Sequence, residues 1–265
     1  MSSNEVLPQG SIRVENLSKS FGGVSAVSDV SLSVPAGTFY GIIGPNGSGK
    51  STLLDCISGV HTSYGGRVHF EDTDISGMAL HKIASLGMLR TFQVSRLFEN
   101  MSVLSNVMVA APEQEGEGLF SAISGSWRKS QAGHLTRARS LIDHYELTRV
   151  EEAYASELSG GQRRLLELAR LLMMRPRAVL LDEPFAGVSP VNRARLLKQL
   201  HSFSEAGITV LMVEHRLELV EELCDKVGVM AEGKIIAEGA MSDLRQDRAV
   251  LSAYLGEFHK DALRM

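Results

Sequence analysis

The sequence predicts an α/β fold in which helices cover both faces of a mostly parallel sheet. Short apolar runs alternate with segments of helical spacing, and a glycine-rich loop joins one such run to a helix. The chain has 265 residues, enough for one large domain or two small ones. Hydrophobic residues make up 44% and charged residues 22%, which favours an ordinary globular protein over a disordered one.

The first half of the chain begins with β-type patterns and continues into a helical insertion. We expect a loop at 18–23 and a helix at 51–57, and strands at 12–17, 30–34, 39–43 and 67–70. Between 93 and 158 no β-rich run occurs, and helical spacing appears at 103–111 and 132–145. This stretch therefore predicts a helical insertion into an α/β domain.

Strand and helix patterns alternate again in the second half. Helices are expected at 161–174, 191–204 and 217–223, and strands at 178–181, 208–213, 226–230 and 234–238. Residues 231–233 have the composition of a hairpin turn, and a helical tail follows from 241 to 265.

Charge and cysteine content exclude several classes of protein. The net charge of -4 gives no basic excess, so we expect no nucleic-acid partner. Cys56 and Cys224 are too few for a disulfide framework and fit a reducing compartment. No apolar run approaches the roughly 18 residues that span a bilayer, and the N-terminus lacks the pattern of a secretory signal. A role at a membrane would therefore depend on another chain.

The glycine-rich loop predicts a nucleotide site. It is Gly44-Pro45-Asn46-Gly47-Ser48-Gly49-Lys50-Ser51, followed by Thr52, and it fits the pattern G-x-x-x-x-G-K-[ST]. Its glycines let backbone N–H groups converge on one anion, and the following helix adds the positive end of its dipole. Lys50 would reach the β- and γ-phosphates, and the Ser51 hydroxyl would bind Mg²⁺. An ordinary strand-to-helix turn is the alternative, but the flanking strand and helix favour the nucleotide site.

A second strand ends in two carboxylates, Asp182 and Glu183. Ligands of open α/β sheets gather at the carboxyl ends of strands. We therefore expect Asp182 to hold Mg²⁺ through water and Glu183 to act as general base on the attacking water. The alternative is that the two acids have no role beyond ending the strand in contact with solvent. The phosphate loop upstream disfavours this alternative.

A rarer pattern, Leu158-Ser159-Gly160-Gly161-Gln162, opens a second helix with glycines and a hydroxyl. With it, the sequence resembles the nucleotide-binding subunits of ATP-binding-cassette (ABC) transporters over almost the whole chain. The resemblance implies a single P-loop cassette with an N-terminal antiparallel β subdomain. Its core and β subdomain would comprise 11–92 and 159–240, its inserted helical subdomain 93–158, and its tail 241–265.

In that family two cassettes pair head to tail, so Ser159 and Gly161 would touch the γ-phosphate of the partner's ATP. Gln93 matches a glutamine that senses Mg²⁺ and γ-phosphate and faces the membrane subunit, and His215 matches a histidine that holds the attacking water in line. Phe21 matches an aromatic ring stacked on adenine. The alternatives are a strand-end polar residue for Gln93, a helix cap for His215 and a small core anchor for Phe21.

One position departs from the family pattern, because Ser189 replaces an acid that helps join the two sites of the dimer. This substitution puts the coupling between the sites in question more than ATP binding itself.

The segment from Leu89 to Val107 is similar to the ATPases of branched-chain amino acid importers. The resemblance implies a peripheral ATPase on the cytoplasmic face of the cell membrane that uses ATP and Mg²⁺. Its partners would be a second ATPase (a copy or a sister chain), two permease subunits and a solute-binding protein. Uptake of urea or short amides, export, a soluble ATPase acting on DNA or ribosomes, and a scaffold without turnover remain as alternatives.

Overall fold

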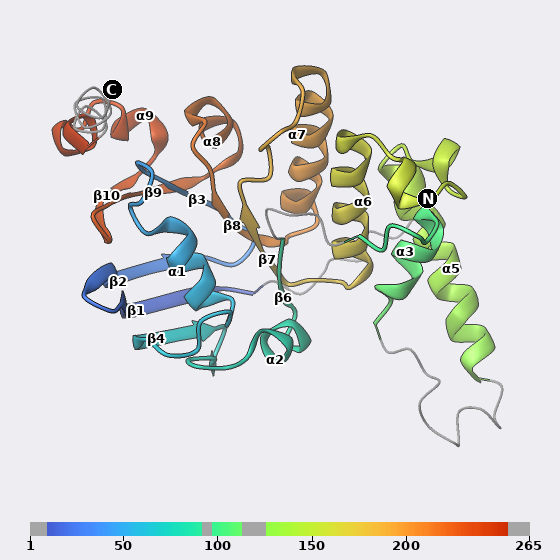
Figure 1. Cartoon of the computed structure of the whole chain (residues 1–265), viewed down its shortest axis with the longest axis horizontal. Coiled ribbons are helices and arrows are strands. Elements are labelled where there is room, and N and C mark those ends of the chain that lie inside the picture. The colour runs from blue at the N-terminus through green and yellow to red at the C-terminus, as the bar shows by residue number, and fades with distance from the viewer. Residues whose placement is uncertain (1–9, 92–96, 113–125, 254–265) are drawn as a thin grey trace. The chain divides into compact units, whose positions relative to one another are not determined.

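The computed structural model describes residues 10–91, 97–112 and 126–253, with the side chains of 126–130 and 191 left undescribed. The chain forms two compact units (Figure 1). The first comprises Met1–Thr91, Arg177–Phe185 and Leu200–Met265, and the second comprises Phe92–Pro176 and Ala186–Gln199.

A six-stranded sheet is the centre of the first unit, in the order β10-β9-β3-β8-β7-β6. Its strands are β3 (Phe39–Ile43), β6 (Met88–Arg90), β7 (Ala178–Asp182), β8 (Thr209–Val213), β9 (Lys226–Ala231) and β10 (Lys234–Gly239). All pairs are parallel except β9 with β10. Every residue of β3, β7 and β8 is buried, which explains why their sequences are mostly apolar rather than alternating. The mostly parallel α/β prediction is confirmed.

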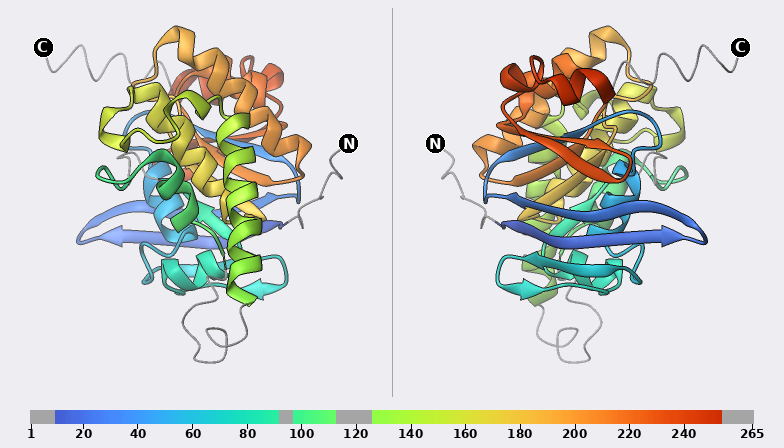
Figure 2. Two further views of the ribbon diagram at one scale, coloured as in Figure 1. Left: turned by 90° about the vertical axis from the view of Figure 1, so that its right-hand side faces the viewer. Right: turned by 90° about the vertical axis from the view of Figure 1, so that its left-hand side faces the viewer.

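An antiparallel sheet of order β2-β1-β4-β5 forms a second layer of this unit (Figure 2). It contains β1 (Ile12–Phe21), β2 (Val24–Val34), β4 (Gly65–Phe70) and β5 (Thr73–Asp74). Helix α1 (Lys50–Ile57) contacts β2 on one side and β7 and β8 on the other. Apolar residues from both sheets and from α1 therefore form one continuous core.

The predicted loop at 18–23 is wrong. β1 continues to Phe21 and pairs with β2, which begins at Val24, so that only Gly22 and Gly23 turn the chain. The pairing register shifts repeatedly between Val14 and Ser20. These bulges interrupt the regular alternation from which a strand is predicted. Three short elements that the sequence analysis did not predict are β5, β6 and α2 (Leu80–Ser85).

The first unit also contains α8 (Leu217–Leu223) and α9 (Met241–Leu244). Residues 231–233 turn between β9 and β10, as the hairpin pattern predicts. Among the residues that the structure describes, no helix is long and apolar enough to cross a membrane.

The second unit is helical. Helices α3 (Val103–Val109), α5 (Ser126–His144) and α6 (Gly160–Met173) contact one another, and η1 (Thr148–Val150) and η2 (Ala155–Glu157) are short 3-10 turns. Helix α7 (Pro190–Glu205) begins in this unit and ends in the first. The unit extends beyond the predicted insertion because α6 packs on α3 and α5. Buried Asn106 anchors the segment before α3 by donating to the carbonyl oxygens of Phe98, Met101 and Ser102.

Candidate active site

The phosphate loop runs from the end of β3 to the start of α1. Gly44, Gly47 and Gly49 have φ values of 148°, 76° and 101°, in a region of backbone conformation that residues other than glycine rarely adopt. Gly49 is the N-cap of α1, and no side chain caps the helix there. The first N–H groups of α1 are therefore open to an anion, which the positive end of the helix dipole also favours.

At two of these positions a side chain is excluded by neighbouring backbone atoms as well as by the positive φ. A Cβ at Gly44 would lie 2.0 Å from the Met230 carbonyl oxygen, and one at Gly49 would lie 2.2 Å from that of Ala26. The N–H of Gly233 in the β9–β10 turn donates to the Ser48 carbonyl oxygen at 3.0 Å. The shape of the loop thus depends on β2 and on the β9–β10 hairpin, which are far from it in sequence.

The Lys50 side chain folds back over the loop. Its ammonium donates to the carbonyl oxygens of Gly44 and Pro45, at 2.8 Å each, and lies 3.5 Å from the Ser48 hydroxyl. Lys50 is buried, whereas Ser51 is exposed and Thr52 half-buried in the first turn of α1. Lys50 thus brings a buried positive charge to the loop, which suits a polyphosphate.

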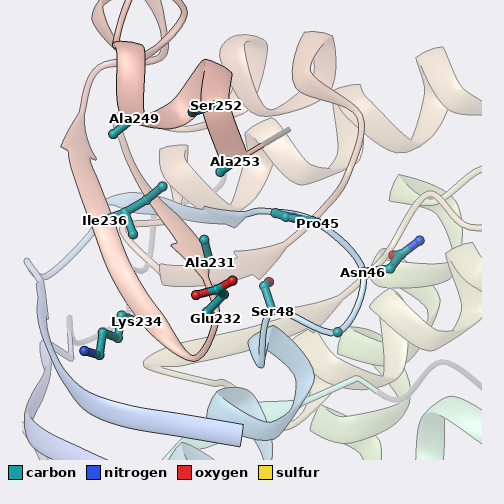
Figure 3. Close-up of a pocket in the computed structure, with 11 residues that line it drawn as sticks. Pro45, Asn46, Ser48, Ala231, Glu232, Lys234, Ile236, Ala249, Ser252 and Ala253 are labelled. Carbon is teal, nitrogen blue, oxygen red and sulfur yellow. The ribbon is translucent and has the colours of Figure 1, made fainter. Parts of the chain in front are cut away.

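A cavity of about 650 Å³ adjoins the loop (Figure 3). The loop forms one wall through Pro45, Asn46, Gly47 and Ser48, and the rest comes from the β9–β10 hairpin and from residues 249–253. Lys50, Asp182 and Glu183 do not line it. The charged residues that the sequence analysis assigns to the triphosphate therefore lie outside the lining of this cavity, and we assign no ligand to it.

Asp182 ends β7 with its side chain buried. One carboxylate oxygen, Oδ2, accepts a hydrogen bond from Arg90 at 2.9 Å, while the other, Oδ1, is buried with no hydrogen-bond partner among the described residues. Burial raises the pKa of Asp182, and the Arg90 guanidinium opposes that shift.

Glu183 follows in a left-handed conformation, with φ of 46°. Its N–H donates to the Val213 carbonyl oxygen at 3.0 Å, which continues the hydrogen bonding between β7 and β8 beyond Asp182. A left-handed residue other than glycine costs on the order of 1–3 kcal/mol and is found mainly where surrounding structure imposes it, often at functional sites. The backbone of this half-buried residue is therefore held by the sheet.

His215 lies just beyond β8, with its side chain 50% exposed. The preceding Glu214 is fully buried, and its Oε1 accepts hydrogen bonds from the N–H groups of His215 and Arg216 at 3.2 and 3.3 Å. The same oxygen lies 3.5 Å from His215 Nδ1. Burial raises the pKa of Glu214. The sequence analysis missed Glu214, because its burial could not be told from its place beside a histidine.

Three neighbouring strand ends therefore bring the loop, Glu183 and His215 to one edge of the six-stranded sheet. β3, β8 and β7 are adjacent and parallel, and the Glu214 N–H donates to the Ile42 carbonyl oxygen at 3.2 Å. Converging carboxyl ends of parallel strands are the usual place for a ligand in an open α/β sheet. Gln93 lies outside the described residues.

Comparison with known proteins decides the family. The model of the ABC transporter family matches residues 27–186. A probable branched-chain amino acid transport ATP-binding protein, LivG, of Archaeoglobus fulgidus is 38% identical over 92% of this chain and 95% of its own length. The high-affinity counterparts BraF of Pseudomonas aeruginosa and LivG of Escherichia coli are 35% and 34% identical over 93% and 95% of this chain, and 98% and 100% of their own. The chain belongs to the ATP-binding subunits of ABC transporters.

Solved structures agree with this assignment. An ABC transporter cassette in its ADP conformation superposes on this cassette with a TM-score of 0.80, at 36% identity, over 93% of this chain and 99% of its own. A nucleotide-free cassette superposes with a TM-score of 0.79, at 35% identity, over 92% and 98% of the two chains.

The signature pentapeptide of the cassette lies at the start of α6, in the second unit. Ser159 is the N-cap: its hydroxyl accepts the Gln162 N–H at 3.3 Å, and the Gln162 side chain accepts the Ser159 N–H at 2.9 Å. The hydroxyl hydrogen of Ser159 can still be donated. Leu158 is buried, and a Cβ at Gly160 would meet nothing within 4 Å, whereas one at Gly161 would lie 2.4 Å from the Asn192 side chain.

Phe21 ends β1 with 46% of its surface exposed. Its ring meets the edge of His61 with centroids 5.2 Å apart, and the Lys19 ammonium lies 5.0 Å from its centroid. The exposed fraction does not fit a core anchor, so the ring remains accessible to a planar base.

The donors near the strand ends fit a hard cation. Asp182 Oδ1 is a buried acceptor without a partner in the part of the chain that the structure describes, and the exposed Ser51 has a hydroxyl one residue beyond Lys50. Mg²⁺ prefers such oxygen ligands and keeps several waters.

Proposed function

We propose that this cassette is the ATP-hydrolysing subunit of an importer that moves branched-chain amino acids across the cytoplasmic membrane. The observation that supports the solute is the identity of 34–38%, over more than nine-tenths of the chain, to proteins named for that transport. The cassette has no contact with the solute in the proposed scheme, so family association is the only guide to it.

In the proposed mechanism, the loop from Gly44 to Thr52 binds the triphosphate through backbone N–H groups and Lys50, and Phe21 stacks on the adenine. Ser51, Asp182 and Gln93 would hold Mg²⁺, which would supply charge neutralisation on the phosphates. Glu183 accepts a proton from the attacking water, and His215 holds the γ-phosphate and that water in line.

A second cassette completes the site in this proposal. Leu158, Ser159, Gly160, Gly161 and Gln162 of each chain would face the triphosphate bound to the other, so ATP joins the pair and hydrolysis releases it. The closing motion would act on two permease subunits through the segment that contains Gln93. A solute-binding protein outside the membrane would deliver the amino acid.

The hydrolytic part of the proposal is tested with Glu183→Gln. This variant should bind ATP with an affinity close to that of the wild type but release phosphate at least 100-fold more slowly, because the amide cannot accept the proton. It should also accumulate as an ATP-bound dimer by size-exclusion chromatography. Phosphate release at the wild-type rate would remove Glu183 from the role of base.

The solute is tested by deleting the gene and measuring uptake of radiolabelled leucine, urea and acetamide in the same cells. Loss of leucine uptake alone supports the proposal, and restoration should require the wild-type gene rather than the Glu183→Gln variant. Loss confined to urea or acetamide would replace the solute while leaving the ATPase assignment intact. If deletion left influx unchanged but slowed the efflux of a solute, the transporter would be an exporter rather than an importer.

A further inference from the structure

One guanidinium connects the helix after the phosphate loop with the strand that carries Asp182. Arg90, the last residue of β6, has a side chain only 4% exposed. One of its terminal nitrogens donates to Asp55 Oδ1 at 2.5 Å and to the Ser58 hydroxyl at 2.8 Å. The other donates to Asp182 Oδ2 at 2.9 Å.

This arrangement assigns different tasks to the two oxygens of Asp182. Oδ2 is held by Arg90, and Oδ1 remains buried without a partner among the described residues. A buried acceptor without a hydrogen bond is unfavourable, and an ion or a water bound at Oδ1 would complete it. The backbone N–H of Asp182 donates to the Thr91 hydroxyl at 3.4 Å. Thr91 follows Arg90 in sequence, so these two residues contact both the backbone and the carboxylate of Asp182.

Cohesion of the fold does not explain a buried charge at this point. Helix α1 already packs on the sheet through Leu53, Leu54 and Ile57, which are fully buried. Replacing a buried ion pair by apolar side chains of similar volume is often neutral or stabilising, because both charges lose their hydration in the folded protein. The forked bridge therefore fits a positioning role better than a purely cohesive one.

We infer that Arg90 is a positioning residue for metal binding: it fixes the carboxylate of Asp182 so that Oδ1 is presented to the Mg²⁺ that accompanies ATP. The inference rests on the proposed function. Asp55 and Ser58 in turn hold the guanidinium, so that the position of Asp182 is set relative to α1 and its phosphate loop. A lysine would keep the charge but would lose the fork that binds two carboxylates at once.

The test compares nucleotide affinity with and without the metal. The purified chain is titrated with a fluorescent ATP analogue in EDTA and again in Mg²⁺, and the ratio of the two dissociation constants is the readout. Arg90→Lys should keep the affinity in EDTA within twofold of the wild type, because the phosphate loop is unchanged. Its gain in affinity from Mg²⁺ should fall at least tenfold.

Arg177→Lys is the matched control. Arg177 also bridges elements of the first unit, with hydrogen bonds to the Leu86 carbonyl oxygen and the Glu71 carboxylate, but it precedes β7 rather than following its carboxyl end. This variant should keep the wild-type gain from Mg²⁺ even where its melting temperature falls. Equal losses in the two variants would mean that any disturbed arginine bridge has the same effect, and would overturn the inference.

Asp55→Asn carries the test if Arg90→Lys does not fold, since Asp55 is partly exposed and Asp182 keeps its own bond to Arg90. Its gain in affinity from Mg²⁺ should be two- to fivefold smaller than that of the wild type. If Arg90→Lys gains as much affinity from Mg²⁺ as the wild type does, the role of Arg90 is overturned. The same holds for Asp55→Asn where only that variant folds. A wild type whose ATP affinity does not respond to Mg²⁺ would also overturn it. A wild type that binds no ATP at all would instead refute the proposed function.

Discussion

Replacing Gly49 by alanine should destabilise the nucleotide-free protein through two separate effects. Gly49 has φ of 101°, and strain in such a region costs an L residue about 1–3 kcal/mol. The new Cβ would lie 2.2 Å from the Ala26 carbonyl oxygen and 2.9 Å from Met230 Cε, where real Cβ contacts stay above 3.0 Å. The backbone must therefore move by about 0.8 Å, and forced contacts of this kind cost typically 1–3 kcal/mol.

The combined loss is about 3 kcal/mol, which corresponds to a fall in melting temperature of roughly 6–12 °C for a chain of this size. Thermal unfolding followed by circular dichroism in the absence of nucleotide measures it. Gly47→Ala is the control, because Gly47 also has a positive φ, of 76°, but its Cβ would meet nothing within 4 Å. Its loss should be about 1 kcal/mol, or roughly 2–4 °C. Equal melting temperatures for the two variants would refute the close approach of the loop to β2.

Three further variants test the site. Lys50→Ala should weaken binding of a fluorescent ATP analogue at least tenfold while exposed Lys82→Ala leaves it unchanged; equal affinities would contradict the loop assignment. His215→Ala should lower the rate of phosphate release at least 100-fold with little change in ATP affinity, and a loss of affinity without a loss of rate would remove it from catalysis. Because burial raises the pKa of Glu214, the native state is favoured while that carboxyl is protonated and loses stability as pH rises through the folded-state pKa. Glu214→Gln escapes this loss, so urea unfolding should show its stability relative to the wild type increasing from pH 5 to pH 8; a constant difference would mean that Glu214 does not titrate as a buried acid.

Local sequence was sufficient where one short segment determines its own geometry. The phosphate loop was predictable because glycines at set positions and a following lysine specify a strand–loop–helix, and the structure has that form from β3 to α1. The antiparallel hairpin of β1 and β2 was only partly predictable, because bulges between Val14 and Ser20 break the alternation on which the prediction depends. The roles of Gln93, Ser159, His215 and Phe21 came from resemblance and stay predictions.

From the sequence alone came the phosphate loop and the two carboxylates at the end of a strand, since each depends on residues close together in the chain. The family and the candidate role of His215 came from motifs spread over almost the whole chain. Only the tertiary structure revealed the left-handed Glu183, the burial of Glu214 and the bridge from Arg90 to Asp182. Arg90 and Asp182 are 92 positions apart, and they meet because β6 and β7 are neighbours in the sheet. Burial and the contacts of a charged side chain depend on which strands lie side by side, and no local pattern specifies that.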